Sequence, residues 1–169
     1  MAKYLNLVSG KVKEATPITT SAGAGDANKI PQTDGSGRLD SSLMPVGFGS
    51  ETKTITTSEA LSAGDLVNIH NSTGLKVRKA DATSPSKPAH GFVLSSVSNG
   101  ASATVYYGNL NTALSGLTVG DELYLSSSTP GGVSATPPSS AGHIVQRVGV
   151  ATGSTEALME IDGNFIELA

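Results

Sequence analysis

Residues 61–69 of the chain read LSAGDLVNI, and residues 117–125 read LTVGDELYL. In both stretches a Gly-Asp pair, Gly64-Asp65 or Gly120-Asp121, precedes a run of alternating apolar residues. Gly-Asp pairs are typical of turns, and a period of two is typical of a strand with one buried face. Recurrence after about 56 residues predicts two related β units in one domain, with the two Gly-Asp pairs as structural turns.

The similarity continues beyond these strands. Residues 71–74 (NSTG) correspond to 127–132 (SSTPGG), and residues 90–93 (HGFV) correspond to 148–151 (VGVA). We therefore expect the units, which we call the first and second repeat, at about residues 51–108 and 114–162. Two such repeats could pack face to face or close into one barrel. Alternation and turn residues place strands at 52–56, 65–69, 75–79, 90–96, 103–107, 122–126, 133–136, 143–150 and 156–162.

The composition fits an all-β fold. The chain has 169 residues, of which 37% are hydrophobic and 4% aromatic, and it has no Trp. The core must therefore be built from Val, Ile, Leu and Ala. We predict a small β-barrel or β-sandwich, with a β-tulip-like arrangement as one form. Tyr106 and Tyr107 are neighbours in a predicted strand, so one should face the core and the other the surface.

Residues 1–50 differ from the body at 51–169. They contain several glycines and show no sustained hydrophobic period, so they cannot bury enough surface to fold alone. We expect an extended N-terminal arm that becomes ordered against a partner or a neighbouring copy. Within the arm, Pro31 favours extended backbone and Asp34-Gly35 a turn. Asp40 or Ser41 should cap one helical turn that ends before Pro45.

The charge argues against nucleic-acid binding and the sequence against a membrane protein. The net charge is -3, and the 11 Lys and Arg residues are scattered, whereas phosphate recognition needs them clustered. The densest group, Lys76, Arg78 and Lys79, is best explained as a solvated strand face. No apolar run approaches the roughly 20 residues of a membrane span, and the N-terminus lacks a signal-peptide core. We expect the protein to be made and assembled inside a cell.

No catalytic, cofactor or metal site is expected. The chain has no cysteine, and His70, His90 and His143 show no metal-ligand spacing. A histidine metal site or a Ser-His-Asp triad assembled by the fold stays open as a less favoured alternative. Asp65 and Asp121 should lie on matching corners of the repeats rather than together, which disfavours a glycosidase pair.

Residues 28–45, NKIPQTDGSGRLDSSLMP, resemble a segment of tailed-bacteriophage fibre and head-decoration proteins. In that segment a Lys-Ile-Pro stretch leads to an Asp-Ser-Ser-Leu-Leu-Pro ending, and Met44 here replaces the second Leu. The body is similar to phage capsid decoration (cement) proteins. That similarity lies in residues 63–67, 77–82, 90–93, 129–133, 136–138 and 146–151, so the resemblance covers about residues 28–161.

The resemblance implies a non-enzymatic virion protein that is made in the host cytoplasm and lies on the outer surface of a capsid. Such a protein bridges neighbouring major capsid protein subunits, stabilises the head and is usually a homotrimer. Our leading hypothesis assigns partner binding to five residues of the arm, namely Ile30, Pro31, Leu39, Leu43 and Met44. The alternative is a tail-fibre or baseplate module with a receptor- or glycan-binding β head, although few aromatics are present for a glycan platform. A small hydrolase is a third hypothesis.

Overall fold

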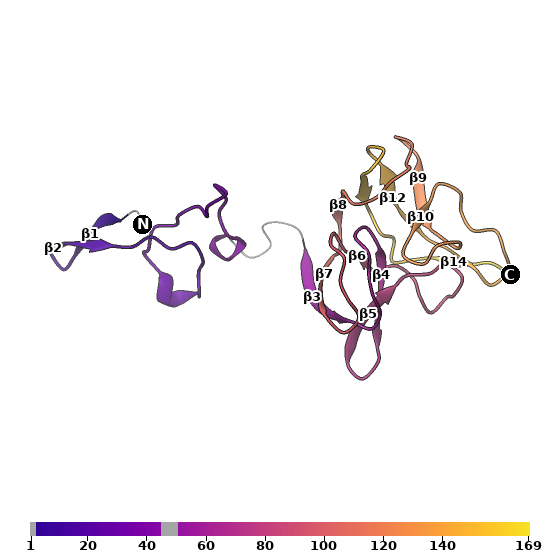
Figure 1. Ribbon diagram of the computed structural model, residues 1–169, viewed down its shortest axis with the longest axis horizontal. Helices are drawn as coiled ribbons and strands as arrows, with labels where there is room; N and C mark the ends of the chain where they lie inside the picture. Colours follow the sequence, from indigo (N-terminus) through magenta and orange to yellow (C-terminus); the bar gives the residue numbers. More distant parts are fainter. Residues whose placement is uncertain (1–2, 45–50) are drawn as a thin grey trace. The chain divides into compact units, whose positions relative to one another are not determined.

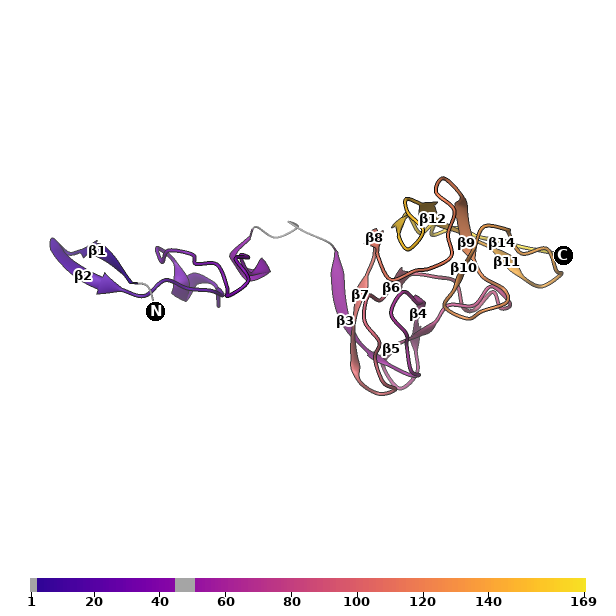
Figure 2. The ribbon, with the colours of Figure 1, turned by 45° about the horizontal axis from the view of Figure 1, so that its top comes forward.

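The structure is a computed structural model that describes residues 3–44 and 51–169 (Figures 1 and 2). The chain divides into two compact parts, Met1–Gly49 and Ser50–Ala169. We call the first part the arm and the second the body, and describe each by itself.

The body is all-β, as predicted, and contains a closed barrel of five strands. These strands are β3 (Thr52–Thr57), β4 (Leu66–Asn71), β5 (Leu75–Lys79), β6 (Gly91–Phe92) and β7 (Ser102–Tyr106). Their order around the barrel is β3-β5-β4-β6-β7. The parallel pair β3–β5 closes the barrel, whereas the other neighbouring pairs are antiparallel.

The second repeat forms a sheet with the same strand order that stays open. Its strands are β8 (Asn109–Asn111), β9 (Glu122–Leu125), β10 (Val133–Ser134), β12 (Arg147–Ala151) and β13 (Ala157–Met159). Their order, β10-β9-β12-β13-β8, matches β5-β4-β6-β7-β3 strand by strand. β11 (Ile144–Val145) and β14 (Ile166–Glu167) pair separately.

The strand register shows that the repeat is a structural duplication. Val67 lies opposite Gly91 between β4 and β6, and Leu123 lies opposite Gly149 between β9 and β12. Two further pairs of the first repeat have equivalents in the second. The pair Ile69–Val77 corresponds to Leu125–Val133, and the pair Thr52–Tyr106 corresponds to Leu110–Leu158. The second set of strands begins at Asn109, earlier than the expected start near residue 114.

The core has two clusters, which lie on opposite sides of the barrel wall. Inside the barrel lie Ile55, Leu61, Val67, Val77, Val93, Ala103 and Val105. The second cluster joins the repeats: Leu66, Ala80, Ala82, Ala89 and Phe92 pack with Leu123, Leu125, Ile144, Val148, Ala151, Ala157 and Met159. Leu66 and Val67 are both fully buried because successive strand residues point to opposite faces. The open sheet therefore packs against the outside of the barrel.

Several predicted strands are shorter or divided. β10 ends at Ser134 where residue 136 was expected, and β13 ends at Met159 where residue 162 was expected. Residues 90–96 were expected as one strand, but β6 ends at Phe92. Beyond Phe92 the pairing with the segment before β4 is irregular. Val93 donates its N–H to the carbonyl of Asp65, and Val97 and Leu61 form an isolated bridge. The strand expected at 143–150 is divided into β11 and β12, on either side of the buried Gln146.

The arm contains a hairpin that the sequence analysis did not predict. β1 (Tyr4–Val8) pairs with β2 (Lys11–Ala15) across the loop Ser9-Gly10. Both loop residues have positive φ, 53° and 75°, as a two-residue hairpin turn requires. No residue of the arm whose burial is described is fully buried. The arm thus has local structure without a core of its own.

Two short-range predictions for the arm are confirmed. Asp34 forms a turn in which its carbonyl accepts the N–H of Gly37. A single 3₁₀ turn spans Ser41–Leu43, and Asp40 caps it by accepting the N–H of Ser42 at 2.9 Å. The predicted stop at Pro45 lies outside the described residues. Another 3₁₀ turn spans Ala24–Asp26.

Candidate functional site

The five candidate residues of the arm fall into two groups. Ile30 and Pro31 precede a loop that is closed by the N–H of Asp34 and the carbonyl of Arg38, 2.8 Å apart. Leu39, Leu43 and Met44 follow that loop, with Leu43 in the 3₁₀ turn. The side chains of Ile30 and Leu39 are 50% and 48% exposed. Both groups thus present apolar surface to solvent.

The arm is held in shape mainly by its main chain. Ile18 forms a parallel bridge with Pro31, in which Ile18 donates to the carbonyl of Ile30 and accepts from Gln32. The N–H of Ser21 donates to Oγ of Ser42 at 2.8 Å. These bonds fix local geometry while leaving the apolar side chains available.

The Gly-Asp turns of the two repeats have matching main-chain geometry. Gly64 and Gly120 have φ values of 89° and 91°. Gly64 donates to the carbonyl of Val93 and Gly120 to that of Ala151, at 2.8 and 2.9 Å. These carbonyls belong to residues that correspond in the sequence repeat.

The surroundings of the two turns differ. A Cβ atom on Gly64 would clash with the carbonyl of Ala113, whereas nothing lies within 4 Å of one on Gly120. Asp65 accepts the N–H of Ser62 at 2.7 Å and forms an ion pair with Lys79 at 3.2 Å. The first turn is therefore wedged between the two repeats.

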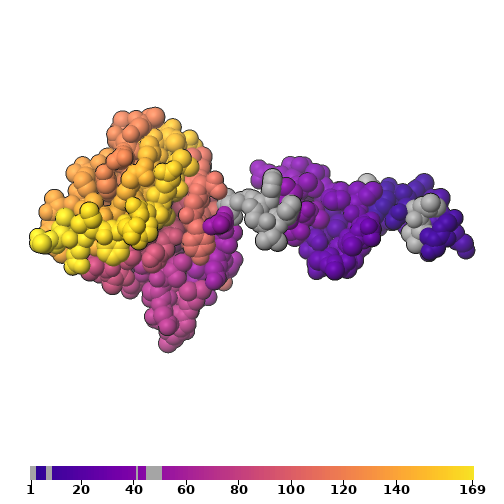
Figure 3. All heavy atoms as spheres, turned by 180° about the vertical axis from the view of Figure 1, so that it is seen from behind, coloured from indigo at the N-terminus to yellow at the C-terminus, as the bar shows by residue number. Residues whose placement is uncertain are grey.

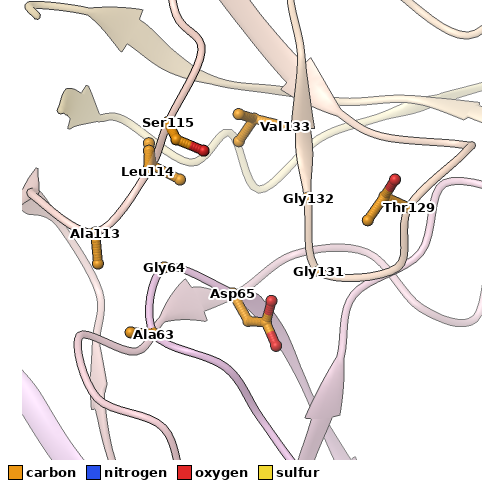
Figure 4. A pocket seen from close by; sticks show the side chains of 10 residues that line it. All are labelled: Ala63, Gly64, Asp65, Ala113, Leu114, Ser115, Thr129, Gly131, Gly132 and Val133. Carbon is orange, nitrogen blue, oxygen red and sulfur yellow. The ribbon is translucent and has the colours of Figure 1, made fainter. Parts of the chain in front are cut away.

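A cavity of about 350 Å³ lies beside this first turn (Figure 4). Its walls are residues 63–65 from the turn, 113–115 after β8, and Thr129 with 131–133 at the start of β10. Figure 4 shows Leu114 and Ser115 on one side of the space and Val133 on the other. We call the gap between residues 113–115 and 131–133 the seam.

The seam occupies the position in the second repeat that is equivalent to the barrel closure in the first repeat. In that closure Thr57 of β3 pairs with Val77 of β5, and the N–H of Ser58 donates to the Val77 carbonyl at 2.9 Å. Val133 is the residue equivalent to Val77. The connection from Leu110 to Leu117 is two residues shorter than the equivalent one from Thr52 to Leu61, and β8 has only three residues. The shortened segment does not pair with β10.

The main chain of Val133 faces the seam. Its ladder partner Leu125 donates its own N–H to Gln146 on the far side, and Ser126 donates to Gly132. Hydrogen-bonding directions alternate along an antiparallel pair, so the N–H and C=O of Val133 point away from β9. The seam therefore presents a strand edge next to a cavity.

A Ser-His contact is present that the sequence did not predict. Oγ of Ser58 lies 2.9 Å from Nε2 of His70, and 3.3 Å from the carbonyl of Val77. Partial burial and the Arg78 charge lower the pKa of His70, while Glu59 opposes them. Among residues 3–44 and 51–169, no carboxylate is hydrogen bonded to this ring, so the contact lacks the third member of a triad.

The other histidines have structural surroundings. Nδ1 of His90 accepts the N–H of Ile69 at 3.0 Å, and burial lowers the pKa of His90. Nδ1 of His143 is buried without a hydrogen-bond partner. In the part of the chain that the structure describes, no three His, Cys, Asp or Glu side chains are grouped to hold a metal ion.

The fold defines a small all-β protein in which a barrel and an open sheet are two versions of one five-strand unit. No protein-family model matches the chain, and a search of the curated proteins gives no match. Within the described ranges, no helix is long and apolar enough to cross a bilayer.

Proposed function

We propose that the chain is a structural virion protein that binds the outer surface of a phage capsid. It bridges neighbouring major capsid protein subunits as a homotrimer and thereby stabilises the head. The observation that carries the proposal is the exposure of Ile30 and Leu39 in an arm without a buried residue among those whose burial is described. These residues belong to the segment that resembles phage proteins, and many copies on a shell would multiply a weak contact.

A tail-fibre or baseplate module is the second candidate, and one feature favours it. The hairpin of β4 and β5 projects from the body (Figure 3). A cavity of about 410 Å³ lies beside its tip, lined by Ile69, His70, Asn71, Gly74 and Leu75. This surface carries no Tyr, Phe or Trp, whereas glycan-binding surfaces rely on such aromatic side chains.

Shell binding by arm variants tests the proposal. Deletion of residues 1–45 should abolish co-sedimentation with capsids that lack this protein. Ile30→Asp and Leu39→Asp should each lower occupancy, because a charge replaces an apolar contact. Val119→Asp is the matched control, since Val119 is 68% exposed but belongs to the body. Full occupancy by the truncated body would exclude the arm as the anchor.

A further inference from the structure

We propose that the seam of the body receives β1 from a second copy of this chain, which adds to β10 as an extra strand. The inference rests on the proposed role of the arm as the partner-binding part. It extends that role from the capsid to self-association and names the site that is used.

The receiving edge has an internal template. In the first repeat the edge of β5 is covered by the parallel strand β3 and by Ser58 directly after it, whose N–H donates to the carbonyl of Val77. In the second repeat the equivalent edge at Val133 opens on the cavity instead. One extended segment placed beside β10 would reproduce the pairing that closes the barrel of the first repeat. Strand addition of this kind is a common mode of peptide recognition.

The strand that is added, β1 of the second copy, has an edge without charged side chains. β1, with the sequence YLNLV, carries no charge, whereas β2 contains Lys11, Lys13 and Glu14. Charged side chains are the usual protection of an exposed edge, and β1 lacks it. An isolated two-stranded hairpin is also marginally stable in water. The hairpin thus gains stability when another strand or sheet covers β1.

The hairpin register shows which main-chain groups of β1 are available. In a two-residue hairpin the residues that flank the loop, here Val8 and Lys11, form a hydrogen-bonded pair, and such pairs alternate. Leu5 and Val12 therefore occupy non-hydrogen-bonded positions, on β1 and β2 respectively. Their N–H groups point outward from the hairpin, so the N–H of Leu5 is free to join a second sheet.

The chemistry of the seam matches that of β1. The cavity walls are uncharged except for Asp65, whose charge is paired with Lys79 at 3.2 Å. The volume of about 350 Å³ offers room for an apolar side chain. The side chain of Leu5 is 74% exposed in the arm, so its burial in the cavity would be favourable.

Cross-linking of two single-cysteine proteins tests the proposal directly, since the natural chain has no cysteine. Full-length Leu5→Cys is mixed with full-length Ser115→Cys and treated with a short bis-maleimide. We expect a cross-linked heterodimer. Val12→Cys mixed with Ser115→Cys is the matched control, because Val12 is 66% exposed on the same hairpin. No heterodimer, or equal yields from both mixtures, would overturn the proposal.

A second measurement uses proline, which lacks a main-chain N–H, to remove one outward-pointing N–H group from either β1 or β2 of the hairpin. Sedimentation velocity of the full chain should show self-association that Leu5→Pro weakens several-fold and Val12→Pro preserves. A monomeric natural chain, or equal effects of the two prolines, would overturn the proposal. Neither experiment contains a capsid. If neither cross-linking nor self-association were seen but the chain still bound shells, only this inference would be overturned. If cross-linking were seen but the chain did not bind shells, the proposed function would be overturned.

Discussion

Gln146 is hydrogen bonded through its side chain to both main-chain groups of Ala89. Its Oε1 accepts the N–H of Ala89 at 2.7 Å, and its Nε2 donates to the Ala89 carbonyl at 2.9 Å and to that of Asp162 at 2.7 Å. Gln146 is only 1% exposed. Because Ala89 belongs to the first repeat and Gln146 to the second, this one side chain links the barrel to the open sheet.

Replacement of Gln146 by Leu should destabilise the body strongly. Leu fills a similar volume but leaves the buried polar groups of Ala89 unpaired, and each such group costs about 1–3 kcal/mol. We expect urea denaturation to show a loss of at least about 2 kcal/mol in the free energy of unfolding. Gln32→Leu, in the arm, should leave the value unchanged. An unchanged value for Gln146→Leu would show that the linkage is dispensable.

Two corresponding glycines should both resist substitution. A Cβ on Gly91 would lie 2.6 Å from the carbonyl oxygen of Tyr106, and one on Gly149 would clash with that of Leu158. Gly91→Ala and Gly149→Ala should each lower stability by about 1–3 kcal/mol, as overpacking does. The control is Gly163→Ala, since nothing lies within 4 Å of that position. If only one of Gly91→Ala and Gly149→Ala were destabilising, the two repeats would differ in how closely the neighbouring strand approaches the glycine.

The body should lose stability as the pH falls below about 6.5, the ordinary histidine value. Burial lowers the pKa of His90, so the unfolded chain binds a proton at a pH where the folded chain does not. Protonation would also break the bond from Ile69 N–H to Nδ1. His90→Asn keeps an acceptor that does not titrate, and should reduce the pH dependence of the urea midpoint.

His70 contributes in the same direction because its pKa is lowered too. His70→Asn therefore serves as the comparison for His90→Asn. Equal pH dependence in the natural chain and in His90→Asn would show that His90 is not a source of the effect.

The body should fold without the arm. All buried residues among the described ones lie between Ile55 and Met159. A protein of residues 51–169 should keep the thermal midpoint and the circular dichroism of the body. A molten or aggregated product would show that the arm contributes to the stability of the body.

The duplication could be predicted from the sequence, but the closure of only one repeat into a barrel could not. The Gly-Asp turns and the strands after them were predictable, because turn chemistry and period-two alternation are local signals. Closure of only one repeat depends on the two residues missing before Leu117 and on whether β8 reaches β10. Loop length alone does not reveal that result, so the seam could not be predicted.

The arm hairpin, by contrast, has a local sequence signal, although it was not predicted. Ser9-Gly10 separates two β-prone runs by two residues, which is a typical hairpin pattern. The expectation for the tyrosines was half wrong. Tyr106 and Tyr107 do pack against different core clusters, but both are partly buried, because the open sheet covers what would otherwise be the surface of the barrel. Tyr106 stacks on Phe92 there, with ring centroids 5.5 Å apart.

Electron microscopy of the intact particle that carries this chain tests the central claim most directly. The proposed function predicts density for the barrel and its open sheet on the outer face of the shell, with the arm in contact with neighbouring major capsid protein subunits. Density for the body on the tail or baseplate, with none on the shell, would contradict it.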